Sequence, residues 1–127
     1  MEQDWKPNAM AWESGTGGSS LFYGLEQSLK LLNETGAENI GKYLEDLTDY
    51  LCERLRTKNY EIVSSRLKSE KSQIVCILPK ADQTSNEVAE KLQTQNIIVS
   101  PRGERIRIAP HFFNNRADIE KLIEALP

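Results

Sequence analysis

The feature that most constrains this chain is a short alternation of basic and apolar residues. In the run Arg105-Ile106-Arg107-Ile108, every second residue is apolar. This period of two predicts a strand that turns both isoleucines toward a core and both arginines toward the opposite face. A guanidinium group can form two parallel hydrogen bonds with a carboxylate or a phosphate, and a strand holds it more rigidly than a loop does. The pattern therefore predicts an anion-binding face on a sheet.

Four helices are predicted elsewhere in the chain. Leucines recur at helical spacing in the first two, and Gly36 marks the end of the first. Thr84 and Glu87 have the spacing of a capping box and start the third helix, while Asn114 or Asn115 caps the fourth. The predicted helices cover residues 20–33, residues 37–57, a segment that begins after Thr84, and a final segment that carries Ile119, Leu122, Ile123 and Leu126.

Four strands are predicted from short apolar runs bounded by turn residues, at residues 60–64, 73–78, 97–100 and 104–109. The last two form a hairpin around Pro101-Arg102-Gly103. The order helix, helix, strand, strand, helix, strand, strand, helix favours a two-layer α+β fold, with helices packed on one face of a small, largely antiparallel sheet. Arg105 and Arg107 would then lie on the uncovered face of this sheet.

Length and composition indicate one compact unit. A chain of 127 residues with 39% hydrophobic and 28% charged residues can bury a single core. We expect a single domain over residues 1–127, in which residues 1–12 form a flexible lead. The net charge of −3 argues against a general nucleic-acid binder, and a local group of arginines in such a chain suits a small anion better.

Cellular context and metal chemistry are constrained by what the sequence contains. No apolar run has the length of a membrane span, and the first residues lack the basic and apolar regions of a signal peptide, so we expect a cytoplasmic protein without a membrane partner. Cys52 and Cys76 have neither a paired spacing nor a histidine partner. We therefore expect no disulfide framework and no metal site, and two thiols that are buried or partly buried.

Three separate motifs carry a resemblance to a known family. The run Trp12-Glu13-Ser14-Gly15-Thr16-Gly17-Gly18, the Tyr23-Gly24-Leu25 that follows, and the segment from Ser100 to Asn115 together resemble the C-terminal part of the class V aminotransferases, which use pyridoxal phosphate. The resemblance extends from about Trp12 to Pro127. It implies that residues 13–127 correspond to the small C-terminal domain of such an enzyme, with an arginine on its last strand and a final helix after the Phe113-Asn114-Asn115 turn.

The resemblance also implies roles for particular residues. Arg107 matches the arginine that receives the α-carboxylate of the substrate. Thr16 matches the threonine that, in the cysteine desulfurase branch of the family, reaches the cofactor phosphate of the neighbouring subunit. From the residues alone, a strand arginine is more often solvated, and a threonine in a Gly-rich turn is an ordinary helix start. Arg102 and Arg105 rank as supporting charge, and His111 as a capping or packing residue. No residue of this chain is assigned a catalytic role.

The cofactor of this family is held as a Schiff base by a lysine on a large domain that precedes the small one. No lysine of this chain has the apolar strand and small-residue context of that site, so pyridoxal phosphate is expected only with a large domain. Cysteine desulfurases of the family carry a nucleophilic cysteine before the arginine strand. Here the connection from Ser100 to Glu104 is short and has no cysteine. The resemblance therefore favours the aminotransferase, epimerase and kynureninase-like branches without choosing among them.

Three functions remain open from the sequence. The favoured one is the C-terminal domain of a class V aminotransferase-like enzyme that acts on an amino-acid substrate, inactive without its large domain. The second is a non-enzymatic module that binds an anion or assists assembly, and the third is one chain of a split enzyme. The expected partners are a cofactor-binding large domain or a second subunit, and a homo-oligomer remains an option.

Overall fold

The computed structural model describes residues 8–9, 18–80 and 82–127. The chain forms two compact units, Met1–Gly36 and Ala37–Pro127. Among the helices of the described residues, none has both the length and the apolar composition that crossing a membrane requires.

The first unit is described mainly through one helix, α1 (Ser19–Thr35). It matches the predicted helix 20–33 and ends as predicted at Gly36, whose φ of 86° is accessible to glycine and whose N–H donates to the Leu32 carbonyl at 3.0 Å. None of its residues is buried. Its exposed large apolar side chains are Leu21, Phe22, Tyr23, Leu25, Leu29 and Leu31.

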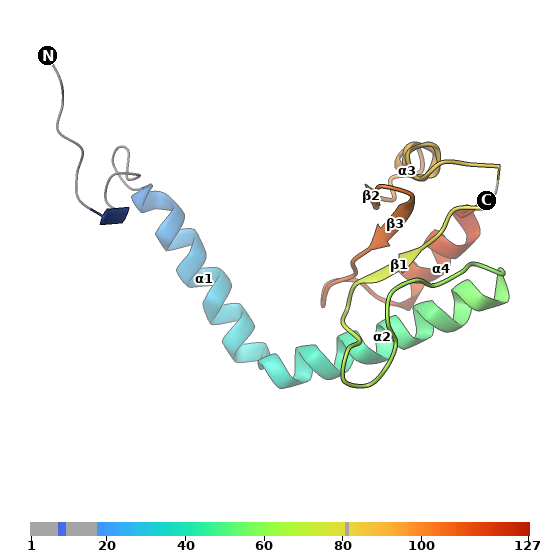
Figure 1. Cartoon of the computed structure of the whole chain (residues 1–127). Helices are drawn as coiled ribbons and strands as arrows, with labels where there is room; N and C mark the ends of the chain where they lie inside the picture. Colours follow the sequence, from blue (N-terminus) through green and yellow to red (C-terminus); the bar gives the residue numbers. More distant parts are fainter. Residues whose placement is uncertain (1–7, 10–17, 81) are drawn as a thin grey trace, which may run out of the picture. The chain divides into compact units, whose positions relative to one another are not determined.

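The second unit is organised around helix α2 (Ala37–Thr57). Its leucines at helical spacing, Leu44, Leu47, Leu51 and Leu55, are all buried, as their periodicity predicts. Helix α4 (Arg116–Ala125) lies beside α2 (Figure 1), and contributes Ile119, Leu122 and Ile123 to the same core. Helix α3 (Ser85–Gln93) adds Val88 and Leu92.

The sheet has three antiparallel strands in the order β1-β3-β2: β1 (Val75–Ile77), β3 (Arg105–Ile108) and β2 (Ser100–Arg102). Val75 and Ile77 of β1 pair with Ile108 and Ile106 of β3, and all four side chains lie in the core shared with the helices. The other face of the sheet is not part of this core. The predicted two-layer α+β fold is confirmed (Figure 1).

The predicted strand over residues 60–64 is wrong. Ile62 forms an isolated bridge with Ile77 of β1, between two backbone hydrogen bonds, from the Val63 N–H to the Cys76 carbonyl and from the Leu78 N–H to the Glu61 carbonyl. The ladder stops because the Cys76 N–H donates to the Ser64 hydroxyl at 3.0 Å, where a longer strand would use a backbone carbonyl. Tyr60, which is predicted to begin the strand, is instead a buried residue of the hydrophobic core.

The predicted hairpin is present, but its turn and its first strand are displaced: β3 lies within the predicted strand 104–109, whereas β2 shares only Ser100 with the predicted strand 97–100. The turn is Gly103-Glu104, so β2 begins at Ser100, where its predicted strand ended. Gly103 has a φ of +59°, which glycine adopts without strain and which suits the first position of a two-residue hairpin turn. The Ser85 hydroxyl at the start of α3 donates to the Gly103 carbonyl at 2.6 Å and ties α3 to this turn.

Side-chain caps start two helices of the second unit. Thr84 and Glu87 form the predicted capping box of α3, and Asn115, not Asn114, caps α4 by accepting from the Ala117 and Asp118 N–H groups. The Asn114 side chain instead accepts from the His111 N–H at 3.0 Å and orders the turn before α4. These caps satisfy backbone donors that helix starts would leave unpaired.

An ion pair joins α2 to α4 outside the core. Arg54 donates to both carboxylate oxygens of Glu120, at 2.8 and 2.9 Å, and the Tyr50 hydroxyl donates to the same carboxylate. The hydrogen bonds from Arg54, followed by that from Tyr50, hold the pKa of Glu120 below its ordinary value. A forked pair of this kind fixes the relative positions of two helices more precisely than a single contact does.

Candidate functional site

Arg107 lies in the middle of the sheet. Its strand β3 is flanked on both sides, so Arg107 pairs with Cys76 of β1 and with Ser100 of β2. Its neighbours Ile106 and Ile108 are buried, with exposed fractions of 0% and 5%. Because side chains alternate along a strand, Arg107, Cys76 and Ser100 belong to the face away from the helices. The predicted register of this strand is confirmed, while the binding role of Arg107 stays a prediction.

The guanidinium group of Arg107 has few partners. Its Nη2 donates to the Ser100 hydroxyl at 3.5 Å, the long limit of a hydrogen bond. Its Nε is buried and has no hydrogen-bond partner among the described residues. A buried donor without a partner is destabilising, and a ligand that accepts a hydrogen bond from it would remove this penalty. The arginine is half-buried, anchored by its strand and incompletely paired.

Two further arginines lie on the same face. Arg102 of β2 stands directly opposite Arg105 of β3, and both are exposed. Arg102 donates to the Pro101 carbonyl at 3.1 Å, and within the described residues none of the three arginines has an ion pair. Like charges directly opposite one another on a sheet are unfavourable. We call Ser100, Arg102, Arg105 and Arg107 the arginine face.

The loop after β3 has a packing function. The His111 ring lies 4.7 Å from the Phe112 ring and 5.1 Å from the Phe113 ring, measured between centroids. The Tyr43 hydroxyl of α2 donates to the Asn114 carbonyl at 2.7 Å and holds the loop against α2. His111 thus packs against both phenylalanine rings, in agreement with its predicted packing role. Its buried Nδ1 has no hydrogen-bond partner in the described part of the chain.

The predicted cofactor-phosphate residue, Thr16, lies outside the described residues, together with the glycines on either side of it. Gly18, the first described residue after that run, accepts the Leu21 N–H at 2.9 Å and starts α1 without a side-chain cap. The assignment of Thr16 therefore stays a prediction.

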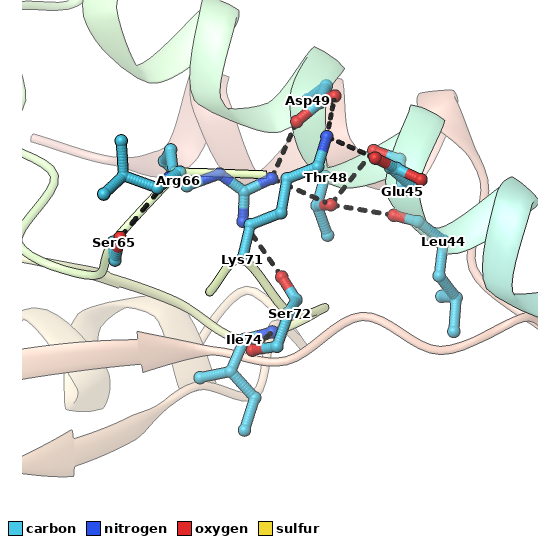
Figure 2. Close-up of polar contacts among 10 residues, drawn as sticks. Leu44, Glu45, Thr48, Asp49, Ser65, Arg66, Lys71, Ser72 and Ile74 are labelled. Carbon is cyan, nitrogen blue, oxygen red and sulfur yellow. Dashed lines mark hydrogen bonds and ion pairs between the residues drawn. The ribbon is translucent and has the colours of Figure 1, made fainter. Parts of the chain in front are cut away.

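Lys71 does not fit covalent attachment of pyridoxal phosphate. The Lys71 side chain is 17% exposed, and its ammonium pairs with Glu45 at 2.5 Å and with Asp49 at 2.9 Å (Figure 2). These two hydrogen bonds, that to Glu45 first, raise the pKa of Lys71. A Schiff-base lysine needs the opposite, a lowered pKa that frees the amine.

The same cluster fixes the loop before β1. Arg66 donates to the Asp49 carboxylate at 2.7 Å and to the Ser72 carbonyl at 2.9 Å (Figure 2). The Lys71 hydrogen bond, more than that of Arg66, lowers the pKa of Asp49 against the effect of burial. Two basic side chains of residues 65–72 therefore bind one carboxylate of α2, and the cluster is a structural attachment of this loop.

A groove of about 490 Å³ lies apart from the arginine face. It is bounded by residues 95–99, by Ile108 to Pro110 and by the first turns of α4, and it includes none of the three arginines. We give more weight to the arginine face, because it groups three arginines without an ion pair among the described residues, whereas the groove lining includes an acidic residue, Asp118, as well as Lys121.

Both cysteines are free thiols, and one is buried and the other partly buried, as expected. Cys52 is buried in the core, and burial raises the pKa of its thiol, which disfavours the reactive thiolate. Cys76 is half-buried. Over the ranges that the structure describes, no group of three His, Cys, Asp or Glu side chains is placed to hold a metal ion.

Comparison with known proteins decides the family. The model of the aminotransferase class V family matches residues 1–122, nearly the whole chain. The chain belongs to the class V aminotransferase family. An uncharacterised aminotransferase of Bacillus subtilis, YcbU, is 22% identical to it over 118 residues, which cover 93% of this chain and 31% of that protein. The chain thus spans about a third of the length of this relative.

Solved structures share this fold, and the chain again covers about a third of each of them. The cysteine desulfurase of Thermococcus onnurineus, solved without cofactor, superposes with a TM-score of 0.79 at 17% identity, over 91% of this chain and 32% of that one. The alanine–glyoxylate aminotransferase of a Nostoc species superposes with a TM-score of 0.74 at 20% identity, over 94% of this chain and 33% of that one. At such identities the likeness concerns the fold.

Sequence reasoning missed the neighbours of Arg107. Ser100 and Cys76 stand on either side of it, and neither was singled out as a site residue. Ser100 was predicted to end a strand before a turn at residues 101–103. With the actual turn at Gly103-Glu104, Ser100 lies directly opposite Arg107. The signal that points to this turn is Gly103, because glycine readily adopts the positive φ that a two-residue hairpin turn requires.

Proposed function

We propose that this chain acts as the C-terminal domain of a class V aminotransferase-like enzyme with an amino-acid substrate, and that Arg107 binds the substrate's α-carboxylate. In this proposal the chain has no turnover alone, because pyridoxal phosphate is held by a large domain or by a separate chain that carries it. Thr16 would contact the phosphate of that cofactor. The compartment is the cytoplasm in this proposal.

The observation that carries the proposal is the state of Arg107. It is anchored in the central strand, half-buried and without an acidic partner in the described ranges, and its Nε lacks a hydrogen bond. An arginine that serves only stability is normally paired or fully solvated. A carboxylate ligand would take two parallel hydrogen bonds from this group in a defined orientation.

The surface of α1 supports the need for a partner. Six large apolar side chains of this helix are exposed, and the chain spans about a third of the length of its relative. Exposed apolar surface of this extent on one helix marks an interaction site. A large domain of the same family is the partner that the proposal assigns to it.

The first test concerns covalent chemistry in the chain alone. Borohydride reduction in the presence of pyridoxal phosphate is expected to leave every lysine without stoichiometric label, because Lys71 is ion-paired and the other described lysines are mostly exposed. Mass spectrometry of the intact chain and of its peptides measures the label. Complete labelling of one lysine would contradict the proposal.

The second test supplies the large domain. A lysine-bearing large domain is expected to restore cofactor-dependent turnover, and Arg107→Ala in this complex should weaken substrate binding by about 2–5 kcal/mol. Arg107→Lys should recover only part of the loss, because an ammonium group lacks the planar fork. Steady-state kinetics with a monocarboxylic amino acid measures both effects.

The matched control is Arg102→Ala, which removes an exposed arginine of the same face. With the monocarboxylic substrate it should change binding much less than Arg107→Ala does. Equal losses from the two substitutions would mean that the face acts as a diffuse positive surface, and the specific role of Arg107 would be rejected.

A further inference from the structure

We propose that the arginine face binds a dicarboxylate, with one carboxylate at Arg107 and Ser100 and the other between Arg105 and Arg102. This inference rests on the proposed function and adds a substrate class to it, namely acidic amino acids and the corresponding dicarboxylic acids.

The first carboxylate position has two kinds of donor. Ser100 accepts from the Arg107 Nη2 at 3.5 Å, and no other hydrogen bond of its hydroxyl occurs in the described part of the chain. A hydroxyl that accepts through its oxygen keeps its own proton free to donate. Ser100 and Arg107 can therefore both donate to one carboxylate, and the strand pairing fixes the distance between them.

The second position follows from the register. Arg105 precedes Arg107 by two residues on β3, so the two side chains leave the same face with origins about 7 Å apart. Arg102 stands opposite Arg105 on β2, as Ser100 stands opposite Arg107. The face thus repeats one arrangement twice, a β3 arginine beside a β2 donor, at a spacing that two carboxylates of one small molecule can bridge.

Electrostatics gives the second position its preference for an anion. Arg102 and Arg105 are directly opposite and have no acidic partner within the described residues, so their mutual repulsion is uncompensated. A carboxylate between them would replace repulsion by two attractive contacts. Among amino-acid side chains, only those of aspartate and glutamate carry a negative charge near pH 7, which points to a carboxylate at this position.

The experiment compares two ligands that differ by one terminal carboxylate, on the full chain in solution. Glutarate has two carboxylates and butyrate has one. Titrations are followed by proton–nitrogen NMR of the arginine Nε–H signals. Glutarate is expected to shift the signals of Arg107 and Arg105 and to bind about fivefold more tightly than butyrate, as an added exposed ion pair allows. Butyrate is expected to shift the signal of Arg107 alone.

Two substitutions separate this inference from the proposed function. Arg105→Gln should reduce the affinity for glutarate to about that for butyrate and weaken butyrate binding much less than Arg107→Gln does. Arg107→Gln should weaken both ligands. Arg56→Gln, which removes an exposed arginine of α2 remote in sequence from the face, is the control for net charge and should change the two ligands alike and only slightly.

Each outcome decides one point. If Arg107→Gln leaves the affinities for both ligands unchanged, the proposed function and this inference are both rejected. Binding that depends on Arg107 but shows no glutarate preference, or a preference that survives Arg105→Gln, would overturn only the dicarboxylate assignment. If Arg56→Gln removes the preference for glutarate as fully as Arg105→Gln does, the preference arises from net charge and the dicarboxylate assignment is overturned. Tighter, Arg105-dependent binding of phosphoserine than of glutarate would place a phosphate at the second position and also overturn the assignment.

Discussion

Helices α1 and α2 share one sequence pattern and differ in their surroundings. Both repeat leucines at helical spacing, yet Leu21 and Leu25 of α1 are 76% and 51% exposed, while Leu47 and Leu51 of α2 are 2% and 0% exposed. The period of a pattern predicts that a helix forms and which stripe is apolar. The period does not show whether the surface that packs against this apolar stripe belongs to the same unit as the helix. The leucines of α2 complete the core of the second unit, whereas the large apolar side chains of α1 are exposed to solvent.

The sharpest test of this difference compares two leucine truncations. Leu51→Ala should destabilise the second unit by about 3 kcal/mol, because it leaves a cavity in a closed core. Leu25→Ala in α1 should cost less than about 0.5 kcal/mol in the chain alone. Urea unfolding followed by circular dichroism measures both. A large loss from Leu25→Ala would show that α1 is covered in solution.

Low pH should destabilise the second unit. The pKa values of Asp49, Glu87 and Glu120 are lowered in the folded chain, by Lys71, by the Thr84 backbone N–H and by Arg54 respectively. Each group binds a proton less readily when folded than when unfolded, so its stabilisation is complete above about pH 5 and is lost as the pH falls below about 4. Thermal melts at pH 7, 5 and 3 should show a falling midpoint.

The control for the acid effect is Glu120→Gln. This variant should melt at a lower temperature than the parent at pH 7 and lose less on acidification, because one of the titrating groups is gone. A pH dependence identical to that of the parent would mean that the ion pair with Arg54 does not contribute to the stability of the unit.

Helix starts differ between the two units as well. Asn115 caps α4 with its side chain, whereas α1 begins at Gly18 without such a bond. Asn115→Ala should therefore cost about 1 kcal/mol of unfolding free energy. The conservative variant Asn115→Asp should retain most of the stability, since a carboxylate also accepts at a helix start. Equal losses in both variants would contradict a capping role.

The smallest effect is expected on the surface of α1. Glu26 pairs with Lys30 one turn away at 2.9 Å, and both side chains are more than half exposed. Glu26→Gln should lower the stability of this helix by about 0.3 kcal/mol. Helical content by circular dichroism at low and at high salt measures it. A salt-independent loss larger than that of Asn115→Ala would require an additional partner for Glu26.

Local sequence signals predict most of the fold. The leucine period, the Thr84 box and the Arg-Ile alternation each predicted an element that the structure contains. The failures concern pairing, which depends on residues distant in sequence. Residues 60–64 have the composition of a strand but form one bridge, because the Ser64 hydroxyl takes the Cys76 N–H. Composition cannot show such a competition.

The candidate site was predictable in its central residue and unpredictable in its neighbours. Arg107 follows from alternation alone, because Ile106 and Ile108 need burial. The neighbours follow from the turn, and a turn at residues 101–103 in place of Gly103-Glu104 changes every partner across the hairpin. The position of Thr16 relative to these residues is not among the features that the structure describes.

The central position of β3 has a consequence for the timing of exchange and folding. Strand β1, about thirty residues earlier in the chain, and strand β2 both hydrogen-bond to β3, so the backbone amides around Arg107 should exchange with solvent only when the whole sheet opens. Pairing over such a separation is also slow to form. The arginine face should thus appear late in folding and, once present, hold its guanidinium groups on the slowest-exchanging strand of the molecule.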